Sequence, residues 1–505
     1  MATPPETVAP PISGDEARRA ARNAGAIAAA SLLSRGLQFG WQLILAPGLG
    51  PAAFGVYGAA AAFIMVGAPL VGFGMGPIVI RDVARRPEQA GRYLSSTLVI
   101  QTLLALAAYA GINAAAALGG YNETVRAFVA IAGLSLFIDA LGNQCHDLLL
   151  AQERMAAASA VTVAHIALLI ALAGASLAAG YGLFGVYAGT LAAGALRAAA
   201  LWALVRRGGV RPAWPVDRHL ARGLLGNGAP LALSAFLTLA YQQADKLLAS
   251  RFVGDRETGY LTVAFIVIFG VVEILNTTVL TALYPMMSRS YDGGRSPQFG
   301  FMVEKLTIFT LIICLPVTLT IALFAPHLLV PLFGEDFRPA AAVLQILIIY
   351  ALLMMTGNVC AQGMLVQNRQ RHLLLIRTTG LGVNLALLLA LLPRLGILGA
   401  AVSSVCAEGL ALALILANFH TTGWDIRRLF SPAARLVGTA AAAGTTMLAL
   451  RDAQPALAIA AGLSLYALAL ARLPILGTDD WDLAYRLLTA MPGGSLVRRW
   501  WRRPL

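Results

Sequence analysis

Long apolar segments dominate this chain and constrain what it can fold into. A helix that crosses the hydrocarbon core of a bilayer needs about 20 mostly apolar residues. Only 12% of the 505 residues are charged, against about 25% in soluble globular proteins. We therefore predict an all-α integral membrane protein rather than a soluble enzyme. Its fourteen predicted transmembrane helices cover approximately 25–47, 56–79, 93–116, 126–149, 156–178, 183–204, 226–250, 259–284, 303–324, 340–365, 374–392, 397–419, 433–450 and 455–472.

The distribution of positive charge predicts the orientation of these helices. Cytoplasmic loops of membrane proteins carry an excess of Lys and Arg. With a cytoplasmic N-terminus, 28 of the 37 Lys and Arg residues fall in cytoplasmic tails and loops, and six fall in outer loops. We therefore expect both termini in the cytoplasm. The asymmetry explains the net charge of +13 without a nucleic-acid partner, and the polar, Pro-rich start of the chain predicts no secretory signal peptide.

An internal repeat divides the chain. LGPAAFGVYGAAAAF (49–63) aligns with VGDRETGYLTVAFIV (253–267), and each segment follows the first predicted helix of a six-helix half. An offset of six helices preserves the direction of crossing, so we expect two parallel six-helix bundles, an arrangement typical of transporters. The predicted order is a disordered cytoplasmic tail (1–24), an N-terminal bundle (25–204), a cytoplasmic linker (205–222), a C-terminal bundle (223–420), two extra helices (421–472) and an amphipathic tail (473–505). The end of this tail, VRRWWRRPL, suits an anionic lipid surface.

Ionisable residues near the middle of a predicted helix are candidates for function. Such residues cost roughly 2.5–3.5 kcal/mol on insertion scales and usually face a cavity or a partner. Arg35 could hold two oxygens of a phosphate group with its planar guanidinium, or it could form a structural ion pair with Asp139. Asp139, Glu273 and Glu408 could each carry a proton or Na⁺, or could hydrogen-bond to neighbouring helices in the protonated form.

Asp245 lies closer to the outer end of its predicted helix. Its carboxylate could bind a coupling cation with Asn384 and Ser404 as neutral oxygen donors, or the adjacent Lys246 could simply neutralise it. The four cysteines lie far apart with no metal-ligand spacing. The sequence also lacks a Walker-type phosphate loop and the commoner hydrolase motifs. We therefore expect no cofactor apart from a coupling H⁺ or Na⁺, and the identity of any metal ion stays open.

Six blocks of sequence, in consistent order, resemble polysaccharide biosynthesis proteins of the oligosaccharide flippase type. That type belongs to the multidrug/oligosaccharidyl-lipid/polysaccharide exporter superfamily. The resemblance extends from about residue 22 to 472. The blocks are LGPAAFGVYG (49–58), GMGPIVIRDVARRPEQAGRYL (74–94), AQERM (151–155), APLALSAFLTLAYQQADKLLASRFVGDRETGYLTVA (229–264), LFGEDFRPAAAVLQIL (332–347) and NLALLLALLPRLGILGAAVSSVCAE (384–408).

The resemblance implies a V-shaped pair of six-helix bundles with two extra helices in the bacterial inner membrane. It implies transfer of an undecaprenyl-pyrophosphate-linked oligosaccharide, the repeat unit of O-antigen, capsule or exopolysaccharide, to the outer leaflet by alternating access. The implied partners are this lipid-linked oligosaccharide, membrane lipids, and a polymerase and glycosyltransferases of the same pathway.

The first predicted helix is also similar to the first helix of lipid II flippases. There a Ser-Arg pair is followed by an Arg-Asp pair. Ser34 and Arg35 match the first pair, whereas Trp41 and Gln42 stand where the Arg-Asp is expected. We therefore assign Arg35, Ser34 and Asp139 to substrate binding.

The same resemblance extends to the Na⁺ site of lipid II flippases. Asp245, Asn384 and Ser404 are approximate matches to its ligands, and Leu388 stands where a further polar ligand is expected. With Glu273 and Glu408, these three residues complete the set of candidates for cation coupling.

Three other functions remain as alternatives to an oligosaccharide flippase. A lipid II flippase and a cation-coupled multidrug antiporter belong to the same superfamily, and an antiporter is expected to have an acidic cavity without a central Arg35. An integral-membrane glycosyltransferase or polymerase is expected to have a large outer loop with clustered acidic or Arg residues. The predicted outer loops are all short, so we expect a transporter and not an enzyme.

Overall fold

The chain is helical throughout the part that the structure describes. The computed structural model describes residues 14–291, 297–420, 427–451 and 454–472, with side chains except at 14–29, 273–286, 288–290, 297–298, 419–420 and 427–428. No β-strand occurs among these residues, and the fourteen predicted segments are helical, two of them (56–79 and 126–149) across two consecutive helices. Among the described residues, twelve helical stretches are long and apolar enough to cross a membrane, and one of them, Ala30–Arg85, covers the second predicted segment and most of the first. The predicted all-α membrane fold is confirmed.

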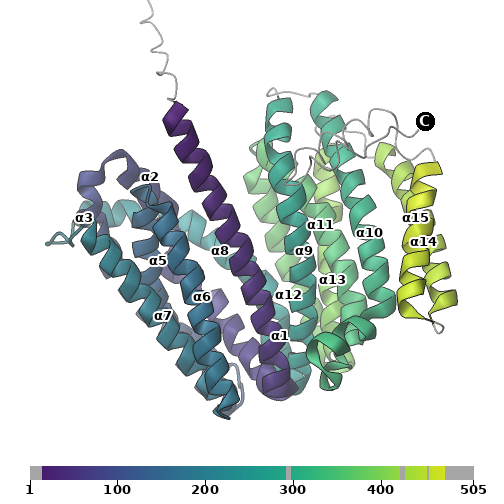
Figure 1. Ribbon diagram of the computed structural model, residues 1–505, viewed down its shortest axis with the longest axis horizontal. Helices are drawn as coiled ribbons and strands as arrows, with labels where there is room; N and C mark the ends of the chain where they lie inside the picture. The colour runs from purple at the N-terminus through teal and green to yellow at the C-terminus, as the bar shows by residue number, and fades with distance from the viewer. Residues whose placement is uncertain (1–13, 292–296, 421–426, 452–453, 473–505) are drawn as a thin grey trace, which may run out of the picture. The chain divides into compact units, whose positions relative to one another are not determined.

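The helices follow one another with short connections (Figure 1). In chain order they are α1 (Gly14–Gly72), α2 (Met75–Arg85), the 3₁₀ helix η1 (Pro87–Gln89), α3 (Ala90–Leu118), α4 (Glu123–Gly133), α5 (Ser135–Ala151), α6 (Met155–Ala178), α7 (Gly182–Arg207), α8 (Arg218–Phe252), α9 (Asp255–Ser290), α10 (Pro297–Phe333), the 3₁₀ helix η2 (Glu335–Phe337), α11 (Ala340–Val366), α12 (Gln370–Leu395), α13 (Ile397–His420), α14 (Arg427–Leu450) and α15 (Pro455–Arg472). Several therefore exceed the roughly 20 residues that a bilayer requires.

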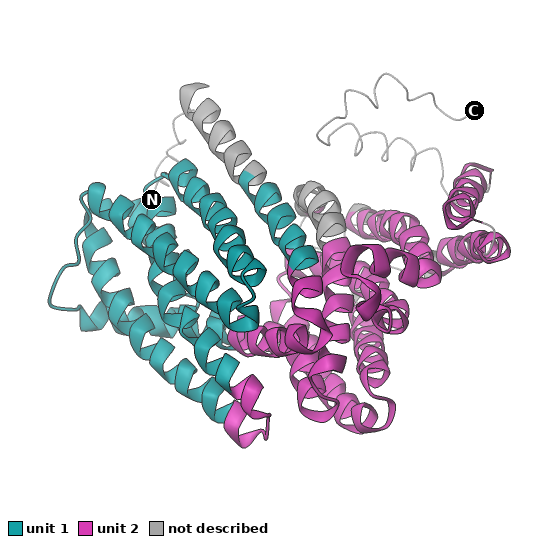
Figure 2. Cartoon of the chain, turned by 60° about the horizontal axis from the view of Figure 1, so that its bottom comes forward, with its two compact units in different colours: residues 1–44, 67–115, 127–233 teal, residues 45–66, 116–126, 234–505 magenta. Residues whose placement is uncertain are grey.

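The first of two compact units comprises residues 1–44, 67–115 and 127–233, drawn in teal in Figure 2. One of its apolar cores joins α2 and the start of α3 to α5 and α7, with Met75, Leu94, Leu148, Leu149 and Leu201 fully buried. The predicted linker, 205–222, begins on the last turn of α7 and ends on the first turns of α8. The predicted disordered tail, 1–24, overlaps α1, because this helix already begins at Gly14.

The second unit comprises residues 45–66, 116–126 and 234–505, drawn in magenta in Figure 2. Its main apolar core is formed by α10, α11, α13 and α14 with contributions from α9, α12 and α15. A smaller cluster of Phe324, Met447 and Ala458 packs α14 and α15 against α10. The predicted amphipathic tail, 473–505, lies outside the described residues.

The two aligned segments of the repeat begin with the same backbone conformation. Gly50 interrupts α1 with φ 72° and ψ 167°, and Gly254 precedes α9 with φ 94° and ψ 175°. This region of backbone space is essentially restricted to Gly. The repeat seen in the sequence therefore encodes two equivalent sharp turns, each of which starts a new helical segment.

After these turns, the segment 51–66 of α1 and the start of α9 lie in direct backbone contact within the second unit. A Cβ atom at Gly55 would lie 1.7 Å from the carbonyl oxygen of Asp255, and one at Gly259 would lie 2.0 Å from that of Pro51. Gly55 and Gly259 are aligned in the repeat. Equivalent residues thus face each other, as they do in contacts about a two-fold axis.

Another pair of matching turns supports the repeat. GLFG (182–185) starts α7 and GILG (396–399) starts α13, with φ of 54° at Gly182 and 59° at Gly396. Positive φ values at these turns favour glycine. Each turn joins two helices that pack along their length, α6 to α7 and α12 to α13.

We expect Gly55→Ala and Gly259→Ala each to destabilise the folded protein by about 1–3 kcal/mol, the usual cost of overpacking. The added methyl group would overlap a main-chain carbonyl that cannot rotate away. The measurement is the midpoint temperature for loss of the monodisperse peak in size-exclusion chromatography of heated, detergent-solubilised protein.

Gly111→Ala in α3 is the matched control, because nothing lies within 4 Å of a Cβ atom at that position. In a helix interior this change should be neutral or stabilising. Equal midpoint temperatures for Gly55→Ala and Gly111→Ala would contradict the close crossing.

Candidate functional site

Two polar pairs join α8 to α13 inside the second unit. The Ser404 hydroxyl donates a hydrogen bond to Asp245 Oδ1 at 3.0 Å, and the Tyr241 hydroxyl donates one to Glu408 Oε2 at 2.8 Å. Residues four apart lie on the same helix face, so Tyr241 and Asp245 on α8 face Ser404 and Glu408 on α13. The sequence therefore places both acids on one interface between two helices.

Helix α12 adds a further polar group to each pair. Asn384 is a polar neighbour of Asp245, and Arg377 Nη1 donates to Glu408 Oε1 at 3.3 Å. Arg377 and Asn384 are seven residues apart, which is about two helical turns. We call Asp245, Ser404 and Asn384 the Asp245 cluster, and Glu408, Tyr241 and Arg377 the Glu408 cluster.

The Asp245 cluster is buried and rich in oxygen atoms. Asp245, Asn384 and Ser404 are 3%, 1% and 2% exposed, and Asn384 Oδ1 has no hydrogen-bonding partner among the described residues. Carboxylate, amide and hydroxyl oxygens are the ligands that hard cations take. The three residues that the sequence singled out therefore lie together. Leu388, one turn further along α12, is fully buried and adds no oxygen.

Lys246 directs its ammonium group toward other partners than the Asp245 cluster. Its Nζ atom donates to Gln243 Oε1 at 3.0 Å and lies 5.6 Å from the centroid of the Phe265 ring. A cation at this distance from an aromatic face is stabilised by the ring quadrupole. Lys246 therefore has its own set of contacts, while it still adds positive charge close to Asp245.

Glu408 has the surroundings of a structural ion pair. Its side chain is fully buried, whereas that of Arg377 is 27% exposed, and Arg377 also contacts Asn358 Oδ1 at 3.4 Å. A buried carboxylate needs such hydrogen bonds to offset the loss of hydration. The side chain of Glu273, the other glutamate considered for cation coupling, lies outside the described residues.

The first unit contains a separate ion pair. Arg197 Nη1 on α7 lies 3.4 Å from Asp139 Oδ1 on α5, and Arg197 Nη2 donates to Asn143 Oδ1 at 2.7 Å. A Cβ atom at Gly142 would lie only 3.2 Å from this guanidinium, so glycine leaves room for it. Asp139 on α5 is therefore paired with Arg197 on α7.

Ser34 and Arg35 are neighbours on α1 with different surroundings. Ser34 is 7% exposed and its hydroxyl has no hydrogen-bonding partner among the described residues, whereas Arg35 is exposed. Adjacent residues on a helix point about 100° apart. Arg35 is therefore accessible from outside the first unit.

Sequence reasoning missed Tyr241, Arg377, Arg197 and Asn143. Arg377 lies within the predicted segment 374–392, and α12 extends this segment back to Gln370. The four-residue spacing from Tyr241 to Asp245, and the seven-residue spacing from Arg377 to Asn384, are the signals that could have found the Glu408 cluster.

Comparisons with known proteins agree with this fold. Two curated relatives are an uncharacterised membrane protein of Methanocaldococcus jannaschii, 26% identical over 37% of both chains, and a probable lipid II flippase of Rhizobium meliloti, 27% identical over 47% of this chain and 45% of the relative. The chain thus matches less than half the length of each.

Two solved structures have a similar fold. A lipid II flippase in an inward closed conformation gives a TM-score of 0.71 at 14% identity, covering 88% of this chain and 98% of the other. An inward-facing multidrug resistance transporter of the MOP superfamily gives 0.61 at 15% identity, covering 77% and 94%. At these identities the similarity shows the fold alone.

The sequence model for the family described as polysaccharide biosynthesis protein matches residues 44–342. This match covers more than half of the chain, including the repeat turns at Gly50 and Gly254, α8 with Asp245, and the start of α11. It shows that this multi-pass membrane protein belongs to the polysaccharide biosynthesis protein family.

Proposed function

We propose that the protein is a flippase that moves an undecaprenyl-pyrophosphate-linked oligosaccharide from the cytoplasmic to the outer leaflet of a bacterial inner membrane by alternating access. The family match over residues 44–342 carries this proposal. The excess of Lys and Arg in alternate loops supports cytoplasmic termini. Glycosyltransferases that assemble the oligosaccharide and a polymerase that extends it are the proposed partners, and the flippase itself performs no covalent chemistry.

Ser34 and Arg35 are the proposed contacts for the pyrophosphate. The Arg35 side chain is exposed, and a guanidinium can donate parallel hydrogen bonds to two phosphate oxygens while keeping its charge. Asp139 stays a candidate substrate contact because 47% of its side chain is exposed although it pairs with Arg197.

Two related functions are less well supported by the same residues. Where lipid II flippases have an Arg-Asp pair, this chain has Trp41, which is 5% exposed, and Gln42, so it lacks these two charged groups. Transfer of lipid II is still the second candidate function, because one relative is a probable lipid II flippase. A transporter of cationic drugs would bring its substrate close to the positive charge of Arg35, which is unfavourable.

The Asp245 cluster is the proposed site of cation coupling. A buried carboxylate is costly when it is charged and unpaired, so binding of H⁺ or Na⁺ at Asp245 would relieve this cost. Ser404 Oγ and Asn384 Oδ1 supply neutral oxygens for Na⁺. Glu408, which already has two donors, contributes less to coupling.

In proteoliposomes that contain the purified protein, we expect fluorescent undecaprenyl-pyrophosphate-linked oligosaccharide to become accessible to a membrane-impermeant quencher at least ten times faster than in protein-free vesicles. Labelled lipid II is the comparison substrate, and its transfer should be slower. Transfer of lipid II at an equal or higher rate would replace the proposed substrate with lipid II. Transfer of neither lipid would contradict a flippase.

We expect Arg35→Ala to reduce this transfer at least tenfold and Arg35→Lys to retain partial activity, because lysine keeps the charge but loses the two-pronged geometry. Each hydrogen bond to a charged group is worth about 1.5–3 kcal/mol. Membrane levels of both variants should equal that of the wild type. The control is Arg126→Ala, which removes an exposed arginine from α4 and should transfer the lipid at the wild-type rate. Full activity of well-expressed Arg35→Ala would show that this arginine does not bind the substrate.

We expect an imposed H⁺ or Na⁺ gradient to accelerate transfer by the wild type, and Asp245→Asn to abolish this acceleration. The neutral amide keeps the size of the side chain but has no negative charge with which to bind H⁺ or Na⁺. The two gradients are applied separately, so the measurement also identifies the ion. Glu335→Gln, at an exposed ion pair with Arg338, is the matched control. Acceleration of Asp245→Asn to the wild-type extent would rule out coupling at this residue.

A further inference from the structure

A groove lies on the first unit between α3 and the segment that joins α7 to α8. It has a volume of about 310 Å³ and is lined by Leu98, Val99, Thr102, Leu103 and Trp214. The side chains of Leu103 and Trp214 are 62% and 67% exposed. Since α3 is a candidate membrane span, a tryptophan at its end lies where membrane proteins place interfacial aromatic rings.

The joining segment is fixed to α3 on both sides of Trp214. On one side, the Ala213 N–H donates to the Gly91 carbonyl at 3.1 Å. A Cβ atom at Gly91 would lie 2.4 Å from the Arg211 carbonyl oxygen, so the two backbones are in contact. Trp214 therefore projects from a segment that is anchored just before it.

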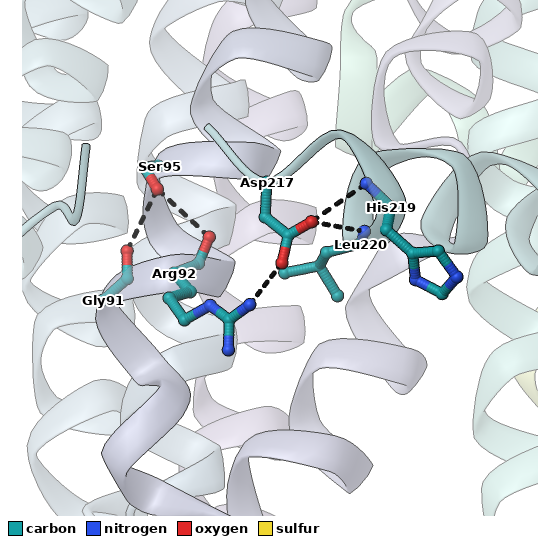
Figure 3. A network of polar contacts seen from close by, with 6 residues as sticks. All are labelled: Gly91, Arg92, Ser95, Asp217, His219 and Leu220. Carbon is teal, nitrogen blue, oxygen red and sulfur yellow. Dashed lines mark hydrogen bonds and ion pairs between the residues drawn. The ribbon is translucent and has the colours of Figure 1, made fainter. Parts of the chain in front are cut away.

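On the other side, Asp217 makes the anchor (Figure 3). Its Oδ2 atom pairs with Arg92 Nη2, and Oδ1 accepts the N–H groups of His219 and Leu220 at 2.9 and 3.1 Å, which caps the start of α8. The Leu220 N–H bond and the Arg92 bond hold the pKa of Asp217 below its usual range. Asp217 therefore stays charged at neutral pH and holds Arg92 in place.

The segment is strongly basic apart from this acid. Residues 206–222 contain five arginines and one acidic residue, Asp217. The five arginines, all exposed, are Arg206, Arg207, Arg211, Arg218 and Arg222. Because Asp217 is already paired with Arg92, the remaining guanidinium groups are available to an anionic ligand.

We propose that this groove is a binding site for an anionic phospholipid of the surrounding membrane. The acyl chain lies against Leu98, Leu103 and the Trp214 ring, and the phosphate lies beside Arg211 at the start of α3. Gly91, which contacts Arg211, precedes Leu98 by seven residues, or about 10 Å along the helix. An apolar groove next to a stretch of chain with five exposed arginines matches a lipid that carries negative charge on its head and hydrocarbon below it.

Native mass spectrometry of the full-length protein in detergent tests the site. We expect phosphatidylglycerol to bind at least ten times more tightly than phosphatidylethanolamine. Trp214→Ala and Arg211→Ala should each weaken the binding of phosphatidylglycerol at least fivefold. Neither side chain contributes to an apolar core, so both variants should elute as folded protein.

Two control variants keep the test specific. Tyr181→Ala removes an aromatic ring of matched exposure, 68%, from the turn between α6 and α7, and Arg126→Ala removes an exposed arginine from α4; both should bind like the wild type. Equal binding of the two phospholipids, or wild-type binding by Trp214→Ala, would overturn the proposal. Tighter binding of undecaprenyl phosphate than of phosphatidylglycerol at this groove would overturn it as well, since the occupant would then be a polyprenyl carrier.

Discussion

The contact between Gly55 and Gly259 is the constraint on which the second unit depends. Both backbones approach so closely that any side chain larger than hydrogen would overlap a carbonyl group. Gly50 and Gly254 precede the two crossing helical segments and have the same backbone conformation. In a membrane, where lipid tails are as apolar as leucine, close packing of small residues is a main source of helix association. The repeated glycines therefore supply packing that larger apolar side chains could not.

Polar groups supply a second kind of contact between helices. In each unit an acid and an arginine on different helices form a pair: Asp139 with Arg197 and Glu408 with Arg377. Such pairs fix the relative positions of helices more than they add net stability, because the more buried partner of each pair, Arg197 or Glu408, loses hydration. Asp245 differs from both acids. It accepts a hydrogen bond from the neutral hydroxyl of Ser404, while the ammonium group of the adjacent Lys246 donates to Gln243.

The connection between α7 and α8 combines positive charge with an aromatic ring. Residues 206–222, from the end of α7 to the start of α8, contain five arginines and an exposed tryptophan, yet backbone contacts and the Arg92–Asp217 pair hold this stretch against α3. A fixed segment can present charge and an aromatic ring at a constant depth, which a disordered linker could not do. The region that connects the two halves of the sequence is therefore a structured part of the first unit.

The sequence by itself determined the helical membrane fold, the positions of the helices and the repeat, because apolar length and glycine spacing are local properties. It also identified Asp245, Asn384 and Ser404, since polar residues are conspicuous in apolar segments. Only the tertiary structure decided which residues pair with Asp139 and Glu408. The ion pairs of Arg197 and Arg377 depend on long side chains that reach across to other helices, and the Glu408 cluster depends on the facing of α8, α12 and α13. Contacts between residues on different helices are set by helix packing, which no local pattern encodes.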